Sequence, residues 1–432
     1  MIEGQAVAVT ISLLVLLLLL RVPVAFGILV AASAGMWMVA GWDVLQGVLE
    51  TVPLSAVSNY EFITVPMFLL MAEFVIISGV ADGIFSAAAA WVGRVRGGLA
   101  IATALAGAGF ASICHSSTAA AATLSATSIP AMLRANYEPR LAYGVVAISG
   151  TLGMLIPPSV AMVLYGLIAD VNLGRLFIAG VIPSVVVAAT IILTVVVLVW
   201  LNPERAPPAK KHSWAEKWRA LKVALPMVAL FLGVVGVIYS GVATPTEASA
   251  MGAFGAFLIA LAMKRLDRQS TLRAAYRAGK TTCMVLLVVM CAHVLAYFLV
   301  MTHVTENLLA WVGTLGMPGW GILIVIYAIY LVLGCFLDLA AMLVLTIPVV
   351  LPLIKALGYD PVWFGIIVIV LGEVGMVTPP VGLNVFVVAR VTQQPVAEVF
   401  RGVLPHVVAH LFAVAILTVW PALVLWLPGT MK

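Results

Sequence analysis

The chain has 432 residues, of which 64% are hydrophobic and only 9% are charged, and its mean hydropathy is +1.20. Soluble globular domains carry about 25% charged residues, so this composition excludes a soluble enzyme and indicates an all-α protein of the lipid bilayer. The net charge of +5 comes mainly from Lys and Arg in loops between apolar runs, where it sets membrane orientation and does not indicate nucleic-acid binding.

Ten apolar runs are long enough to cross a hydrocarbon layer about 30 Å thick. They cover residues 5–20, 23–40, 60–80, 140–169 and 176–201 in the first half, and 223–241, 246–263, 281–301, 361–388 and 403–427 in the second. The first run follows no basic segment and precedes no small-residue cleavage site, so we expect a retained span rather than a signal peptide. Residues 42–58 and 264–280 are predicted to be interfacial arm helices.

Two further segments, 98–130 and 320–352, are too long for one span and have polar or turn-prone middles. Dividing either segment gives two arms of about 16 residues, fewer than the roughly 20 that a crossing helix needs. Each segment is therefore predicted to be a re-entrant helical hairpin that enters and leaves on the same side. The tips are expected at Cys114–Thr118 and at Gly334–Asp338.

The sequence contains an internal repeat with a constant spacing of 222 residues. Residues 130–139 (PAMLRANYEP) reappear as residues 352–361 (PLIKALGYDP), and the same spacing pairs glycines and prolines on both sides without a gap. We therefore predict two copies of one fold, residues 1–201 and 223–432, joined by a basic cytoplasmic linker at 202–222. Each copy has five spans, an odd number, so the second copy is expected to be inverted relative to the first.

The distribution of basic residues predicts the orientation in the membrane. Placing the linker and segment 264–280 in the cytoplasm puts all but three of the 22 Lys and Arg residues on that side. The exceptions are Arg175, Lys355 and Lys432. Both termini are then outside, Glu50 and Glu306 face the periplasm, and one hairpin opens from each side of the membrane.

Both copies interrupt a span with glycines and a double proline, within residues 150–159 and 372–384. Proline removes a backbone N–H donor, so carbonyl groups at membrane depth lose their helical partners and need a cation or a polar neighbour. A single proline usually gives only a kink. A doubled and repeated Pro-Pro opposite a polar hairpin tip instead favours sites for cations and for an anionic substrate.

We predict one cation site where each hairpin tip meets the broken helix of its own copy. The first would use Ser116 and Ser117 with the backbone of Gly150, Gly153 and Pro157. The second would use the backbone of Leu337, Gly372, Met376 and Pro379 and the hydroxyl of Thr378, while Asp338 and Glu373 supply charge or carry a proton. The substrate is expected between the tips, near His115, Thr118, Ser159, Gly382 and Asn384.

Other polar residues give weaker signals. Glu73 lies within a span, where an acid is expected to pair with a scaffold residue or with a neighbouring subunit. His406 and His410 have no carboxylate beside them, and the four cysteines form no CxxC pair, so neither a transition metal nor a disulfide is indicated. The sequence also lacks HExxH, GxSxG and phosphate-binding glycine motifs, so it predicts no enzyme and no organic cofactor.

The chain resembles the large membrane subunit of tripartite ATP-independent periplasmic (TRAP) transporters, the DctM-like permeases, over essentially its whole length. The resemblance is carried by residues 116–121 (SSTAAA), 150–159 (GTLGMLIPPS), 358–361 (GYDP) and, most specifically, 378–384 (TPPVGLN). His115 departs from the family's pattern, in which glycine usually precedes the two serines.

This resemblance implies an elevator-type, Na⁺-coupled importer of the bacterial inner membrane. It would work with a small four-span membrane subunit and a periplasmic substrate-binding protein, and it would import organic acids such as C4-dicarboxylates or sugar acids. Two alternatives stay open. A stand-alone dicarboxylate or citrate carrier would share the fold, and a channel would share the re-entrant hairpins, although paired sites in an inverted repeat suit alternating access better than an open pore.

Overall fold

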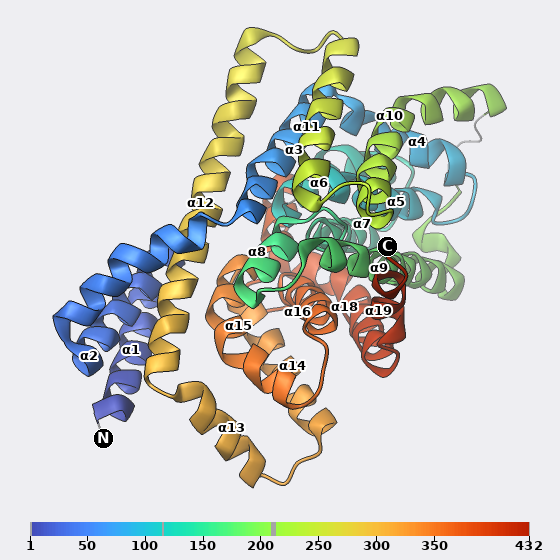
Figure 1. Ribbon diagram of the computed structural model, residues 1–432. Helices are drawn as coiled ribbons and strands as arrows, with labels where there is room; N and C mark the ends of the chain where they lie inside the picture. Colours follow the sequence, from blue (N-terminus) through green and yellow to red (C-terminus); the bar gives the residue numbers. More distant parts are fainter. Residues whose placement is uncertain (1, 115, 209–212, 432) are drawn as a thin grey trace.

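The computed structural model describes residues 2–114, 116–208 and 213–431, and within these ranges the regular structure is entirely helical (Figure 1). Nine of the described helices are long and apolar enough to cross a membrane. The predicted all-α membrane fold is therefore confirmed. The re-entrance of the hairpins and an elevator motion remain predictions.

Six helices, which we call the frame, are connected by packing contacts. Helix α2 (Val24–Val57) runs along α12 (Arg268–Met301), and α3 (Thr64–Ser78) runs along α11 (Pro245–Ala262). Helix α1 (Ile2–Leu19) packs on α2, and α10 (Trp214–Tyr239) packs on α11. Each of the two main pairings, α2 with α12 and α3 with α11, joins one helix from each half of the sequence, so the frame holds the two halves together.

Capping residues set where three of the frame helices begin, and a glycine sets where α2 bends. Helices α10, α11 and α12 each start at a capping box, formed by Ser213 with Glu216, Thr244 with Glu247, and Asp267 with Ser270. In each box the cap side chain accepts a hydrogen bond from a backbone N–H group that has no partner within the helix. Helix α2 bends at Gly41, whose φ of +80° lies in the left-handed region that favours glycine.

The remaining long helices form a second group, which we call the core bundle. It contains two helical hairpins, α5 (Gly98–Cys114) with α6 (Ser117–Arg134) and α14 (Gly319–Phe336) with α15 (Leu339–Ala356). It also contains two interrupted helices, α7 (Pro139–Ser149) with η2 (Thr151–Met154) and α8 (Val160–Ala169), and α16 (Pro361–Gly375) with α17 (Leu383–Thr392). Helices α9 (Leu173–Leu201) and α18 (Val396–Val419) complete it. Figure 1 shows the first hairpin towards one end of the molecule and the second towards the other.

The two halves interlock within the core bundle. Helices α7 and α18 approach so closely that a β-carbon on Gly144 would collide with the backbone of Gly402. Their N-terminal ends are tied by Arg140, which donates a hydrogen bond of 2.5 Å to Glu398. At the starts of α9 and α16, Arg175 and Asp360 form an ion pair of 3.7 Å. These contacts join the two halves of the core bundle.

The predicted boundaries differ from the structure in several places. The first predicted arm, residues 42–58, is set off from the preceding part of α2 by the kink at Gly41. The second is not a separate helix, because residues 268–280 are the first turns of α12. Residues 214–222 of the predicted linker already belong to α10. The last span ends at Val419, and a short helix, α19 (Ala422–Gly429), follows it. The sequence does not predict helices α4 (Val80–Val92) and α13 (Val304–Thr314) or the short turns η1 (Tyr60–Ile63) and η3 (Pro203–Arg205).

The hairpin arms are also longer than predicted. The second hairpin has two arms of 18 residues, and both are among the helices of membrane-spanning length. The first has arms of 17 and 18 residues. Arm length alone therefore does not decide re-entrance, because a re-entrant hairpin and a pair of full crossings both leave the flanking loops on the same side.

Candidate functional site

The first broken helix is interrupted at the predicted position. Helix α7 ends at Ser149, a 3₁₀ turn covers Thr151–Met154, and α8 starts at Val160 after the cis-linked pair Pro157-Pro158. The side chain of Ser159 caps α8 by accepting hydrogen bonds from the N–H groups of Ala161 and Met162, and it donates one of 2.5 Å to the carbonyl of Met154. The interruption is thus a capped turn within the core bundle.

The second broken helix repeats this design with a wider connection. Helix α16 ends at Gly375, the pair Pro379-Pro380 is again cis-linked, and α17 starts at Leu383 after Gly382, whose φ is +60°. The two copies differ in exposure, because Pro157 and Pro158 are buried whereas Pro379 and Pro380 are exposed. The Pro-Pro pair of the second interruption is therefore the accessible one in this structure.

Each hairpin tip contacts the interruption of its own copy, as predicted. In the first copy, a β-carbon on Gly153 would lie 3.5 Å from the carbonyl carbon of Ser116 and 3.7 Å from the N atom of Ser117. In the second copy the backbones are closer, because a β-carbon on Gly375 would lie 2.5 Å from Cα of Gly334. Glycine is required at position 375 for this approach.

The two interruptions are also linked to each other. The hydroxyl group of Ser117 donates to the sulfur atom of Met376 over 3.4 Å, which joins the first tip to the second broken helix. The side-chain amide of Asn384 donates to the carbonyl of Ala147 over 3.2 Å, which joins α17 to α7. Residues of the two interruptions are therefore in direct contact across the two copies.

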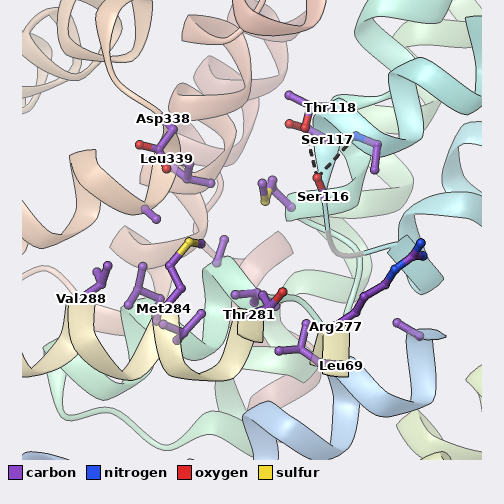
Figure 2. A pocket seen from close by; sticks show the side chains of 18 of the residues that line it. Leu69, Ser116, Ser117, Thr118, Arg277, Thr281, Met284, Val288, Asp338 and Leu339 are labelled. Atoms are coloured by element: carbon purple, nitrogen blue, oxygen red, sulfur yellow. Dashed lines mark hydrogen bonds between the residues drawn. The ribbon is translucent and has the colours of Figure 1, made fainter. Parts of the chain in front are cut away.

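A cavity of about 600 Å³ lies between the two tips and the frame. Figure 2 shows Asp338 and Leu339 on one side, Ser116, Ser117 and Thr118 on the other, and one face of α12 beneath them. Met154 and Met376 border it from the interrupted helices, and Leu69, Ala72 and Glu73 border it from α3. Its volume lies in the range of about 300–1,000 Å³ that is usual for small-molecule sites.

The cavity contains some of the predicted site residues and not others. Those that line it are Ser116, Ser117, Thr118, Asp338 and Met376. Those outside its lining are Gly150, Gly153, Pro157, Ser159, Leu337, Gly372, Glu373, Thr378, Pro379, Gly382 and Asn384. His115 lies outside the described residues. The ion-binding and substrate-binding roles of all these residues remain predictions.

Several buried polar groups of the core bundle have unused hydrogen-bonding capacity. Both carboxyl oxygens of Glu373 and the side-chain oxygen of Asn384 have no hydrogen-bond partner among the described residues. Burying an unpaired carboxylate is costly, so Glu373 stays a candidate for a functional group. His406 and His410 are fully buried, and the described residues contain no cluster of three or more His, Cys, Asp or Glu that could hold a metal ion.

Sequence reasoning missed the contribution of the frame to the cavity. The sequence places Arg277 among the basic residues of a surface segment, but α12 puts it on the lining together with Thr281 and Met284. Glu73 is predicted to have a partner, and the structure pairs it with Arg277 over 3.7 Å. The only available signal is the helical spacing of residues 277, 281, 284 and 288, which puts them on one face of α12.

These features define a class of protein. A multi-pass helical bundle in which two hairpin tips meet two interrupted helices beside a small-molecule cavity is a membrane transporter rather than an enzyme. The family described as "Tripartite ATP-independent periplasmic transporter, DctM component" matches residues 11–423. The chain therefore belongs to the DctM family and is the large permease subunit of a TRAP transporter.

Individual relatives agree with this assignment. The chain is 36% identical over 372 residues to the C4-dicarboxylate TRAP transporter large permease protein of Pseudomonas aeruginosa, covering 86% of this chain and 87% of the relative. It is 31% identical to the sialic acid TRAP transporter large permease protein of Vibrio cholerae, covering 87% and 88%. The solved YdaH transporter of Alcanivorax borkumensis shares the fold, with a TM-score of 0.59 at 16% identity, covering 87% of this chain and 88% of that one.

Proposed function

We propose that this subunit imports an organic acid together with Na⁺ across the inner membrane. The observation that supports the proposal most is the contact between a hairpin tip and an interrupted helix in each copy of the repeat. Backbone carbonyls and the hydroxyls of Ser116, Ser117 and Thr378 lie at these two places. Hard cations are bound by such oxygen atoms.

The proposed transport mechanism is an elevator motion of the core bundle against the frame. The bundle is tied together by Arg140 with Glu398 and by Arg175 with Asp360, whereas the cavity separates its tips from α3 and α12 of the frame. An internally connected body beside a fixed scaffold suits alternating access by rigid-body movement.

The proposed substrate class is an organic acid. The relatives named above are described as transporters of C4-dicarboxylates and sialic acid, which are carboxylic acids. The chain is also 28% identical to an ectoine TRAP transporter large permease protein of Halomonas elongata. The cavity suits a compact acid, because apolar walls from Leu69, Met284 and Val288 accompany hydroxyls from the first tip. We propose a C4-dicarboxylate as the first compound to test.

The proposed partners are a small four-span membrane subunit and a periplasmic binding protein, and they lead to a first prediction. The purified chain alone in liposomes is expected to show no Na⁺-driven uptake of succinate or sialic acid above background, because the binding protein delivers the ligand. Adding both partners should restore uptake under an inward Na⁺ gradient. Uptake at a similar rate by the chain alone would contradict the partner requirement and favour a stand-alone carrier.

The proposed orientation places both termini in the periplasm and leads to a second prediction. Glu50→Cys and Glu306→Cys, made after the four native cysteines are replaced by serine, are expected to react with an impermeant maleimide added to intact spheroplasts. Lys264→Cys should react only after the membrane is opened. Labelling of position 264 alone from outside would reverse the orientation while leaving the two-copy architecture unchanged.

A further inference from the structure

The charged groups of the cavity are few and unevenly placed. Among its lining residues only Glu73, Arg277 and Asp338 carry charge, so Arg277 is the one cation of the described lining. Asp338 and Arg277 lie towards opposite sides of the view in Figure 2. Thr281 and Met284 follow Arg277 along α12 in the direction of Asp338. An anion entering this cavity therefore meets one positive group, and that group belongs to the frame.

The pairing of Arg277 in this structure is incomplete. Its guanidinium lies 3.7 Å from the Glu73 carboxylate, which is longer than a hydrogen bond, and the Arg277 side chain is 62% exposed while that of Glu73 is 19% exposed. Among the described residues, no hydrogen bond joins the guanidinium to a protein acceptor. Arginine offers five N–H donors in a planar fork that matches a carboxylate, so most of its binding capacity is unused here.

We propose that Arg277 binds the carboxylate of the transported acid and that Glu73 is the counter-ion it holds when the cavity is empty. This inference rests on the proposed function and assigns the substrate's acidic group to a frame residue instead of a hairpin tip. A carboxylate can bind both arms of the guanidinium with short hydrogen bonds, which Glu73 does not form. Glu73 therefore neutralises Arg277 in the empty cavity without occupying its donors.

The charge balance links this site to cation binding. With Glu73 and Arg277 compensating each other, the empty lining carries the charge of Asp338 alone, and a bound carboxylate adds a further negative charge beside two acids. Neighbouring negative charges disfavour an anion unless cations lie close by. Cations at the hairpin tips, which border the same cavity, supply that compensation. Substrate affinity is thus expected to depend steeply on Na⁺, and Glu73 should increase that dependence.

The test measures binding of radiolabelled succinate and sialic acid to the purified transporter with its small subunit, together with uptake through the complete system. Arg277→Gln is expected to weaken binding of the transported acid about tenfold or more, and Arg277→Lys less, because lysine keeps the charge but not the fork. Arg273→Gln is the matched control, since Arg273 lies one turn earlier on α12, is exposed and does not line the cavity. It should leave binding unchanged.

Amide analogues, in which one carboxylate is replaced, separate recognition of the carboxylate from a general loss of folding. The wild type is expected to bind the acid about tenfold better than the analogue in which one carboxylate is an amide, and Arg277→Gln should lose this preference. Glu73→Gln should strengthen binding severalfold at low Na⁺, because it removes the negative charge that an incoming carboxylate would meet beside Arg277. Weaker binding in Glu73→Gln would instead assign Glu73 to the positioning of Arg277 and overturn the counter-ion role.

The outcomes also separate this inference from the proposed function. If the wild type takes up neither acid in the presence of Na⁺, the proposed function fails and the inference fails with it. If the wild type takes up one of them and Arg277→Gln keeps both the affinity and the preference for the acid over the amide, only the inference is overturned.

Discussion

Uptake by the Gly375→Ala variant is expected to fall to less than about a tenth of the wild-type rate, because a β-carbon at position 375 would collide with the second hairpin tip. It would lie 2.5 Å from Cα, 2.6 Å from the carbonyl carbon and 2.9 Å from the oxygen of Gly334. All three atoms belong to the backbone, so the tip must withdraw from the interrupted helix. Overpacking of this kind costs about 1–3 kcal/mol, and about 1.4 kcal/mol corresponds to a tenfold change in an equilibrium.

Two further glycines calibrate this result. Gly153 occupies the equivalent position in the first copy, where an added β-carbon would meet Ser116 and Ser117 at ordinary contact distances of 3.5–3.7 Å, so Gly153→Ala should lose less activity. Gly236 lies on α10, where an added β-carbon would have no atom within 4 Å apart from the adjacent backbone of its own helix, so Gly236→Ala should retain wild-type uptake. The measurement is the initial rate of Na⁺-driven uptake, with thermal unfolding in detergent to show that each variant folds. Wild-type uptake by Gly375→Ala would show that the close approach of tip and interruption is unnecessary for transport.

Much of the core bundle could be predicted from the spacing of 222 residues. The first residues of α6 and α7, Ser117 and Pro139, have counterparts in Leu339 and Pro361, which begin α15 and α16. Both interruptions fall where Gly and Pro-Pro remove helical hydrogen bonds. The pattern works here because duplicated sequences place helix starts and breaks at equivalent positions, whatever the rest of the molecule does.

The parts that sequence reasoning missed depend on other kinds of information. Helices α4 and α13 are short, at 13 and 11 residues, and give no apolar run of spanning length. The contact of Asn384 with Ala147 joins non-equivalent residues of the two copies, which a repeat spacing does not reveal. Arg277 follows a run of basic residues typical of a membrane surface, and only the position of α12 across the cavity from the hairpin tips places it on the lining.

The Ser116→Ala and Thr378→Ala variants are each expected to raise the Na⁺ concentration for half-maximal uptake severalfold, and together by more than about tenfold. Ser116 shares a hydroxyl contact of 3.2 Å with Thr118, and Thr378 donates to the carbonyl of Val374 over 2.6 Å. Each hydroxyl oxygen keeps a lone pair that can bind a cation. Removing one ligand from each proposed site should therefore weaken Na⁺ binding at both.

Matched hydroxyl deletions provide the control for this prediction. Thr123 lies in the first hairpin and Thr392 in the second interrupted helix, and each donates to the carbonyl four residues earlier, as Thr378 does, without lining the cavity. Thr123→Ala and Thr392→Ala should keep the wild-type Na⁺ dependence, which is measured as uptake against Na⁺ concentration at fixed membrane potential. If Ser116→Ala and Thr378→Ala behave like these controls, the proposed ion sites are wrong.

If uptake instead follows a pH gradient without Na⁺, the coupling ion is a proton and its proposed carrier is the buried carboxyl group of Glu373. Glu373→Gln should then abolish uptake.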